Sequence, residues 1–500
     1  MKIKIKKKNL FEIFLENISE EEKNTVNKFL KDFNSRCSLA ISDKNKMKKD
    51  FENAILYYYN QNINLTDALE LLNLKNLGGF YSRPAQSWFP LDDAAKIYPV
   101  SMEHGVMSVF RLSVNLKEKV IPELLQMALT FTIKRFPSFA TTLKKGVFWH
   151  YLDSTKRCFN IYEEKDVPCQ ALKVSHTGSQ SFRTLYYNNR ISIEFFHVLT
   201  DASGGMEFLK SLLSEYIRLT GVIINSQNKI LNINDNPDIS EFVNEFANIE
   251  KTPNASGLYN KTATQMTGNL SKIKPCRILN FKMQADKLKE VAKKYNVTVS
   301  TYILSLMFIA CKSACEIYDG EFAIQVPVNM RKFYTSRTLR NFSMYCGIRL
   351  PISQIQDVES IKDEIVNQLT IKSSKEEMHK MLYATKRLIK NIRLIPLIIK
   401  QPIAKFISGL LGDLAFTSTL SNIGVVDLPE EYKNYIQNME FILNTSTTNR
   451  ASCGLITYNN IATLSITKMT KDPSFENKIY ELLLKDGIDI IVEGSELYED

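Results

Sequence analysis

The chemistry that this sequence can support centres on its histidines, because imidazole titrates near neutral pH and can act as a general base. There are five, at positions 104, 150, 176, 197 and 379. His197 has distinctive surroundings: it ends a segment with strand character in which Ile191, Ile193 and Phe195 share its face, and Asp201 follows four residues later. A strand that ends in a loop can place an imidazole in a cleft. The alternative is a histidine that only satisfies a turn.

Two glycines extend the pattern around His197. Gly204 and Gly205 follow Asp201 and open a predicted helix, where glycine allows the backbone to approach another segment closely. In this interpretation Asp201 fixes the loop and holds His197 in place. The segment 194–205, EFFHVLTDASGG, is therefore the first candidate for an active site.

Other catalytic patterns are missing from the sequence. It has no P-loop, no GxSxG, no HExxH and no dinucleotide-binding glycine fingerprint. Two of the remaining histidines, His176 and His379, lie in polar or lysine-rich surroundings and are predicted to be solvated. His150 ends the run VFWH beside a predicted strand and is only a minor candidate for lining the site. Eight cysteines are spread without a CxxC pair or ligand spacing, which predicts reduced thiols in a cytoplasmic protein and no metal site.

The length and composition predict a soluble protein with more than one core. The chain has 500 residues, 44% of them hydrophobic and 24% charged. Residues 1–80 are predicted to form a helical appendage, with a capping box at Ser19 and Glu22 and a second helix ended by Gly78 and Gly79. The basic N-terminus lacks the apolar core of a secretory signal, and the longest apolar runs fall short of the roughly 20 residues of a membrane span.

Strand and helix patterns alternate from residue 81 onward. Within 81–225 we expect strands in 105–116 and 159–167, a helix in 119–136, a hairpin turning at Asn188 and Asn189, and a helix in 205–219. Residues 226–274 are polar and aperiodic, which is typical of a linker or crossover. Residues 275–500 repeat the same order of elements, with strands in 276–283, 321–331, 439–447 and 461–468. The predicted fold class is α/β (α+β), with two subdomains.

The net charge of +10 comes mostly from scattered lysines, so we expect no nucleic-acid partner. A local excess occurs at 379–412, which holds seven Lys or Arg and no acid. One interpretation is a solvated basic face on helices that pack against the body. The other is an amphipathic surface that contacts anionic lipid, admits a hydrophobic acceptor or meets the phosphates of coenzyme A.

The segment around His197 resembles the H-H-x-x-x-D-G signature of the chloramphenicol acetyltransferase-like superfamily, which includes condensation domains, wax ester synthases and alcohol acetyltransferases. Further segments fall in the order that this superfamily shows. They are KRFPSF at 134–139, VPVNMR at 326–331, RNF at 340–342 and STLSNIG at 418–424. Together with LDDAAKIYP they look most like bacterial alcohol acetyltransferase-like proteins. The resemblance covers roughly residues 81–495.

The sequence departs from the superfamily pattern at three positions. The first histidine of the signature is Phe196, and the glycine after the aspartate is Ala202. The catalytic histidine of the superfamily is the second one, which maps onto His197. The second arginine of the R-H-P-x-L-R element is Ala140, so Asp201 needs another partner, for which Arg331 is the candidate.

The resemblance implies two subdomains, each a mixed sheet flanked by helices, that meet at a tunnel entered by donor and acceptor from opposite ends. His197 would take a proton from the acceptor as it attacks an acyl thioester, without an acyl-enzyme. The residues proposed to bind the oxyanion or line the tunnel are Ser421, Asn422, Gly204 and Gly205, although SNIG is also ordinary turn chemistry.

The predicted function is acyl transfer to a small-molecule alcohol, for which a hydrophobic alcohol is one option. Acyl-CoA is the predicted co-substrate, and no tightly bound cofactor is expected. One alternative is a condensation-like enzyme that uses a carrier-protein thioester and an amine. The other is a non-catalytic binding or assembly protein, which the changes at Phe196 and Ala202 leave open. The predicted location is the cytoplasm, with peripheral membrane contact through 379–412 as an option.

Overall fold

The computed structural model describes residues 9–83, 88–100, 107–172, 179–256, 258, 261–407, 413–444 and 449–498. His104, His176 and the last residues of the basic stretch 379–412 lie outside this part of the chain. In the described part, none of the helices is long and apolar enough to cross a bilayer. All eight cysteines are buried and free of disulfides.

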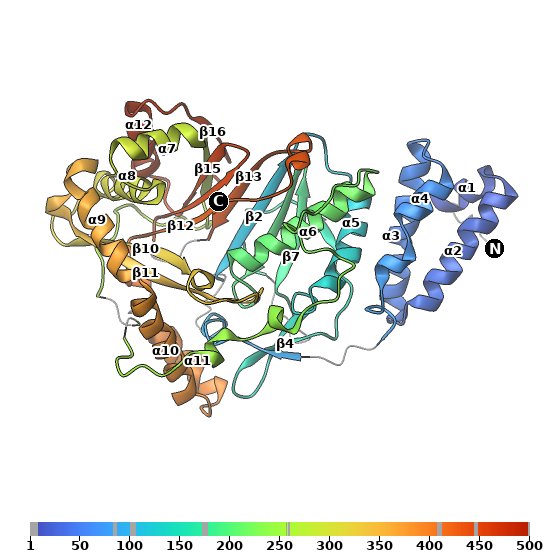
Figure 1. Ribbon diagram of the computed structural model, residues 1–500, viewed down its shortest axis with the longest axis horizontal. Helices are drawn as coiled ribbons and strands as arrows, with labels where there is room; N and C mark the ends of the chain where they lie inside the picture. Colours follow the sequence, from blue (N-terminus) through green and yellow to red (C-terminus); the bar gives the residue numbers. More distant parts are fainter. Residues whose placement is uncertain are drawn as a thin grey trace, which may run out of the picture.

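Four helices form the N-terminal appendage at one end of the molecule (Figure 1). They are α1 (Leu10–Asn17), α2 (Glu20–Arg36), α3 (Ile41–Asn60) and α4 (Leu65–Leu71). The predicted capping box begins α2, because the backbone N–H of Ser19 donates to Glu22 at 2.9 Å and that of Glu22 donates back at 3.3 Å. The second predicted helix ends earlier than expected, at Leu71, and a 3-10 turn at Leu74–Leu77 leads to Gly78 with φ of 55°.

Buried aromatic side chains attach the appendage to the rest of the protein. Phe51 of α3 packs against Phe131 of α5 (Pro122–Thr132), with ring centroids 6.1 Å apart. The hydroxyl of Tyr58 donates to the carbonyl of Leu219 at 2.6 Å. The hydroxyl of Tyr81 donates to the carbonyl of Thr130 at 2.7 Å. The appendage therefore shares a continuous core with the first half.

The first half contains a five-stranded mixed sheet with the strand order β13-β2-β8-β7-β5. The strands are β2 (Val109–Leu116), β5 (Ile161–Glu163), β7 (Phe182–Tyr187), β8 (Arg190–Phe196) and β13 (Ile436–Leu443). Phenylalanines of β2 and β8 meet α6 (Ala202–Leu219), whose Phe208 lies 6.2 Å from Phe195 between ring centroids. The predicted hairpin is confirmed, with Asn188 at φ of 49° in the β7–β8 turn.

A smaller antiparallel sheet lies beside it, with the order β1-β4-β3-β6. It is built from β1 (Trp88–Pro90), β3 (Thr142–Lys145), β4 (His150–Asp153) and β6 (Ser179–Gln180). The β3–β4 hairpin ends near α11 (Leu397–Ile407) of the second half, at the lower edge of Figure 1.

The second half is a seven-stranded mixed sheet with the order β11-β10-β12-β14-β15-β9-β16. Its strands are β9 (Arg277–Gln284), β10 (Glu321–Asn329), β11 (Ser343–Pro351), β12 (Ser418–Val425), β14 (Ala451–Tyr458), β15 (Ile461–Lys468) and β16 (Ile491–Gly494). Its helices, besides α11, are α7 (Ala285–Lys294), α8 (Val299–Ser313), α9 (Val358–Lys372), α10 (Lys375–Asn391) and α12 (Ser474–Lys485). The prediction of two helix-flanked mixed sheets with a helical appendage is confirmed.

One strand crosses between the halves. β13 belongs to the second half of the sequence, but it pairs antiparallel with β2, so that Phe441 lies opposite Leu112. The division into residues 1–80, 81–225, 226–274 and 275–500 stays a proposal. In the structure, β13 of the last segment belongs to the sheet of the first half. The crossover 226–274 contains short 3-10 turns at Ile239–Phe242 and Glu245–Asn248.

Candidate active site

His197 directly follows the last residue of β8 and lies where the two halves meet. Its backbone N–H donates to the carbonyl of Ser108 at 2.9 Å. The half-buried imidazole packs between Tyr98, which stacks on it with centroids 5.2 Å apart, and Phe110, at 4.8 Å. This aromatic packing fixes the plane of the ring.

The side chain of Asn341 sets the tautomer of His197. Its amide nitrogen donates to the carbonyl of His197 at 2.6 Å, and since a carbonyl only accepts, the NH₂ group is identified. The amide oxygen then faces imidazole Nδ1, 3.3 Å away. An oxygen acceptor at this position favours a proton on Nδ1 and leaves the lone pair on Nε2.

Burial lowers the pKa of His197 below its ordinary value of 6.5. The hydrogen bond to Asn341, the charge of Asp201 and hydrogen bonding with the backbone of Thr200 act in the opposite direction, but they do not overcome it. The imidazole is therefore neutral at pH 7, which is the state that a general base needs.

A buried carboxylate, Asp92, contacts the side chain of Asn341. Asn341 also reaches the Asp92 carboxylate, with 3.4 Å between Nδ2 and Oδ2, and Asp92 accepts from the backbone N–H of Ala95 at 2.7 Å. Nη2 of Arg340 lies 3.8 Å from Oδ2 of Asp92. Burial raises the pKa of Asp92 to about 6, against the opposing effect of Arg340. Asp92 and Tyr98 both come from the segment 91–98.

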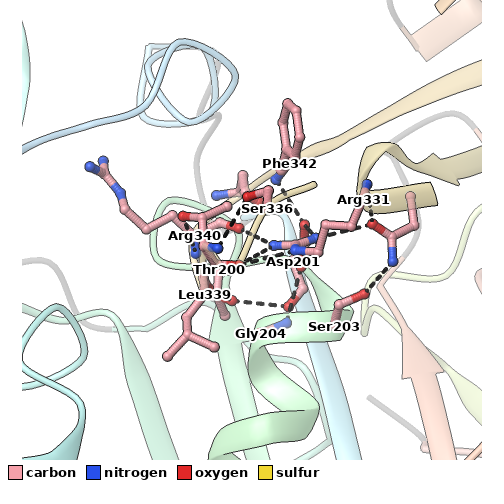
Figure 2. Close-up of polar contacts among 12 residues, drawn as sticks. Thr200, Asp201, Ser203, Gly204, Arg331, Ser336, Leu339, Arg340 and Phe342 are labelled. Atoms are coloured by element: carbon pink, nitrogen blue, oxygen red, sulfur yellow. Dashed lines mark hydrogen bonds and ion pairs between the residues drawn. The ribbon is translucent and has the colours of Figure 1, made fainter. Parts of the chain in front are cut away.

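Asp201 is the N-cap of α6 and the centre of a dense polar cluster (Figure 2). Its Oδ1 accepts from the backbone N–H of Gly204 at 3.1 Å. Its Oδ2 accepts from Arg331 Nη1 and from the backbone N–H of Phe342, both at 2.8 Å. Arg331, proposed from the sequence as the partner of Asp201, therefore forms the ion pair.

Arg331 also fixes the loop that carries Asn341. Its Nε and Nη2 donate to the carbonyl of Thr338 at 3.0 and 2.8 Å, and Nη2 donates to that of Arg340 at 2.6 Å (Figure 2). The hydroxyl of Thr200 donates to the carbonyl of Leu339 at 2.6 Å. The HVLTD segment and the loop 338–342 are thereby joined into one unit.

Close packing explains the two glycines after Asp201. A Cβ on Gly204 would lie 2.0 Å from the carbonyl oxygen of Leu339, and one on Gly205 would lie 3.1 Å from the ring of Phe195. Both amides point to Asp201, to its carboxylate and its carbonyl respectively. The oxyanion role predicted for Gly204 and Gly205 is therefore not supported, because neither N–H is available.

Ser421 and Asn422 lie in β12 of the second half. Asn422 is exposed; its Nδ2 donates to Ser300 Oγ at 2.9 Å, and its Oδ1 accepts from the backbone N–H of Gly424 at 2.8 Å. This is the turn chemistry that the sequence left open. Ser421 is half-buried, beside Gly454 of β14. No hydrogen bond described for these two residues reaches His197.

The three departures from the superfamily pattern all lie at structured positions of the fold. Phe196 is the last residue of β8 and is 1% exposed, on the face opposite to that of Phe195. Ala202 is the first residue of α6, where alanine is a good helix former. Arg135 of KRFPSF forms a buried two-pronged ion pair with Glu241 of the crossover, at 2.6 and 2.7 Å. Ala140 of the same motif is buried, with 1% of its surface exposed.

Sequence reasoning missed Asn341, Asp92, Tyr98 and Glu241 as site or support residues. Asn341 lies in the RNF segment, and Asp92 and Tyr98 lie in LDDAAKIYP, so the resemblance had marked these segments. Neither motif indicated a contact with His197. Two cavities in the described part of the chain, of about 450 and 470 Å³, are lined by appendage residues and by residues around His379 respectively. In the described ranges, no group of three or more His, Cys, Asp or Glu side chains could hold a metal ion.

No protein-family model matches this chain, and no curated protein matches it. Solved structures do match. Trichothecene 15-O-acetyltransferase from Fusarium sporotrichioides is 12% identical, with a TM-score of 0.52 over 80% of this chain and 94% of its own. TRI101 of the same fungus, complexed with coenzyme A and T-2, is 7% identical, with a TM-score of 0.56 over 81% and 100%.

A third match comes from the condensation domains. A variant of the starter condensation domain of rhizomide synthetase, complexed with C8-CoA and Leu-SNAC, is 10% identical, with a TM-score of 0.51 over 80% of this chain and 94% of its own. At such identities the likeness shows the fold alone. The chain has the two-subdomain chloramphenicol acetyltransferase-like fold that acetyltransferases and condensation domains share.

Proposed function

We propose that this protein transfers an acyl group from a coenzyme A thioester to an alcohol, with His197 as general base. The observation that carries the proposal is the contact of Asn341 with both the carbonyl and Nδ1 of His197, which leaves Nε2 as a lone-pair donor on a neutral ring. A fold shared with two acetyltransferases supports acyl transfer as the reaction class. The tunnel through which both substrates would reach His197 is part of the proposal.

The proposed reaction is a direct transfer from thioester to alcohol through a tetrahedral intermediate. Nε2 of His197 takes the hydroxyl proton while the alcohol oxygen bonds to the thioester carbonyl carbon. The tetrahedral intermediate then breaks its C–S bond, and the imidazolium returns the proton to the coenzyme A thiolate. The products are an ester and free coenzyme A, without an acyl-enzyme. Asp201 touches neither substrate and positions the loop, and Ser421 stays the candidate oxyanion donor.

The test measures free thiol. The purified protein is incubated with acetyl-, butyryl- and octanoyl-CoA, each with and without a panel of short and long alcohols. Thiol release that requires an alcohol, together with the matching ester by mass spectrometry, supports the proposal. Release at the same rate with and without alcohol indicates hydrolysis, and no release with any pair contradicts acyl transfer from coenzyme A.

The same experiment tests two alternative functions. The likeness to a starter condensation domain favours testing a carrier-protein donor, through pantetheinyl thioesters, and an amine acceptor. Product formation only with these pairs would assign the condensation-like reaction. A non-catalytic role, suggested by Phe196 and Ala202, would give binding without products from either donor. The cytoplasmic location stays a proposal, supported by the eight free cysteines.

A further inference from the structure

An exposed apolar surface rimmed by basic side chains lies where α10, α11 and the β3–β4 hairpin meet. Its apolar members are well exposed: Leu394 (69%), Ile398 (77%), Ile399 (50%), Val147 (71%) and Phe148 (41%). We call these residues, with the exposed Lys145, Arg387, Lys390 and Arg393, the α11 surface. It has no part in the proposed acyl-transfer step.

Hydrogen bonds make this surface continuous although it comes from both halves. The backbone N–H of Leu397 donates to the carbonyl of Val147 at 2.9 Å. Lys400 Nζ donates to the carbonyl of Phe148 at 2.8 Å. The same ammonium lies 3.3 Å from the ring centroid of Trp149, so Lys400 faces inward and anchors α11. The exposed aliphatic residues of α11 and of the hairpin tip are therefore held side by side.

The charge of the surface has one sign. Its four charged members, Lys145, Arg387, Lys390 and Arg393, are all exposed bases, and the stretch 379–412 contains no acid. Aliphatic side chains flanked by lysine and arginine fit the boundary between acyl chains and anionic headgroups. A nucleic acid would use the charges but not the exposed aliphatic residues. Protein interfaces are enriched in aromatic residues, whereas four of the five exposed apolar members of this surface are aliphatic.

We propose that the α11 surface docks on an anionic lipid bilayer, with the aliphatic side chains of Leu394, Ile398 and Val147 inserted and the flanking bases on lipid phosphates. A short path links this surface to the site. Lys96 lies 5.7 Å from the ring centroid of Trp149, and two residues later Tyr98 stacks on His197. If the proposed function holds, docking would bring the site to a membrane-dissolved acceptor.

The experiment is co-sedimentation of the full chain with vesicles of phosphatidylcholine alone and of phosphatidylcholine mixed with phosphatidylglycerol. Binding is expected only to the anionic vesicles, and it should weaken strongly in about 1 M NaCl, where the Debye length falls to about 3 Å. Absence of binding to anionic vesicles at low salt would overturn the proposal. This readout does not depend on acyl transfer, so the two proposals can fail separately.

Paired variants separate insertion from charge. Leu394→Gln with Ile398→Gln should weaken binding at least about tenfold, because uncharged polar side chains replace the inserted aliphatic ones. Lys390→Gln and Arg393→Gln should each weaken it about fivefold. The control is Ile223→Gln, which changes an isoleucine elsewhere that is 87% exposed and should leave binding unchanged. Equal loss in the control, or loss with the charge variants but not with the aliphatic pair, would contradict docking by insertion.

Discussion

His197 and Asp201 lie four residues apart in one loop, but their contacts differ in kind. Asp201 is 4% exposed and accepts three hydrogen bonds at 2.8 to 3.1 Å, one of them from the arginine of an ion pair. His197 is half-buried and holds one longer side-chain contact at 3.3 Å, with two aromatic rings against it. Asp201 is fully engaged by the protein, whereas Nε2 of His197 is the ring nitrogen that the proposed function assigns to the substrate.

The difference separates a structural end of the loop, at Asp201, from the end that carries His197. Charge-assisted hydrogen bonds from Arg331 and a helix N-cap make the Asp201 end rigid. The rigid end then holds Asn341 in place, because Arg331 also binds the carbonyls on either side of Leu339. Stability and reactivity should therefore respond separately to substitutions at the two ends.

The largest effect on stability is expected at the ion pair. Arg331→Met removes the partner of a buried carboxylate and should lower the free energy of unfolding by about 3–5 kcal/mol. Urea denaturation of the variant measures this loss. Arg337→Met is the matched control, because Arg337 is 65% exposed and lies 3.6 Å from Asp238 at the surface. Equal effects of the two substitutions would show that Asp201 does not depend on its arginine.

The next effect concerns the close approach of the loop to α6. Gly204→Ala would place a methyl group 2.0 Å from the carbonyl oxygen of Leu339, so it should destabilise the fold by about 1–3 kcal/mol. Gly205→Ala meets only ring edges at 3.1 to 3.3 Å and should cost less. Thermal denaturation of both variants gives the order. A more damaging Gly205→Ala would contradict the packing described.

Asn341→Ala removes the side chain that orients His197. We expect kcat to fall about tenfold, since a general base depends on its orientation and protonation state. Its hydrogen bond raises the pKa of His197, so its loss should move the acidic limb of the pH–rate profile to lower pH. Asn422→Ala is the control and should change neither value. An unchanged profile in the Asn341 variant would remove the proposed positioning role.

The smallest expected effect is the position of the acidic limb in the wild-type protein. Burial lowers the pKa of His197, and only the neutral imidazole accepts a proton. Activity should therefore be lost as the pH falls, with a midpoint below 6.5. A pH–rate profile of kcat/KM measures it. A midpoint above 6.5 would mean that the net effect of the surroundings stabilises the imidazolium.

The sequence predicted more of the elements than of their partners. The β7–β8 hairpin and the structural role of Asp201 in its loop follow from local patterns, and Arg331 followed from a motif. β13 has a strand pattern, but nothing in that pattern says that it pairs with β2 of the other half. α3 was missed although Met47, Phe51 and Tyr58 mark one buried face.

The contacts of Asn341 could not be predicted for a related reason. They join residues from the segments 91–98, 197–201 and 338–342, which are far apart in the chain and meet only after both halves have folded. A motif such as RNF marks a position but not its neighbour. The support of His197 is therefore a property of the tertiary structure.

The measurement that most directly tests the role of His197 is alcohol-dependent thiol release by wild-type protein and by His197→Ala, at equal folded concentration. We predict a rate about 10²–10⁴ lower for the variant, with a thermal denaturation midpoint close to that of wild type, because His197 contributes few of the contacts that hold the loop. An active wild-type protein whose His197→Ala variant keeps the full rate would contradict the assignment of His197 as the base.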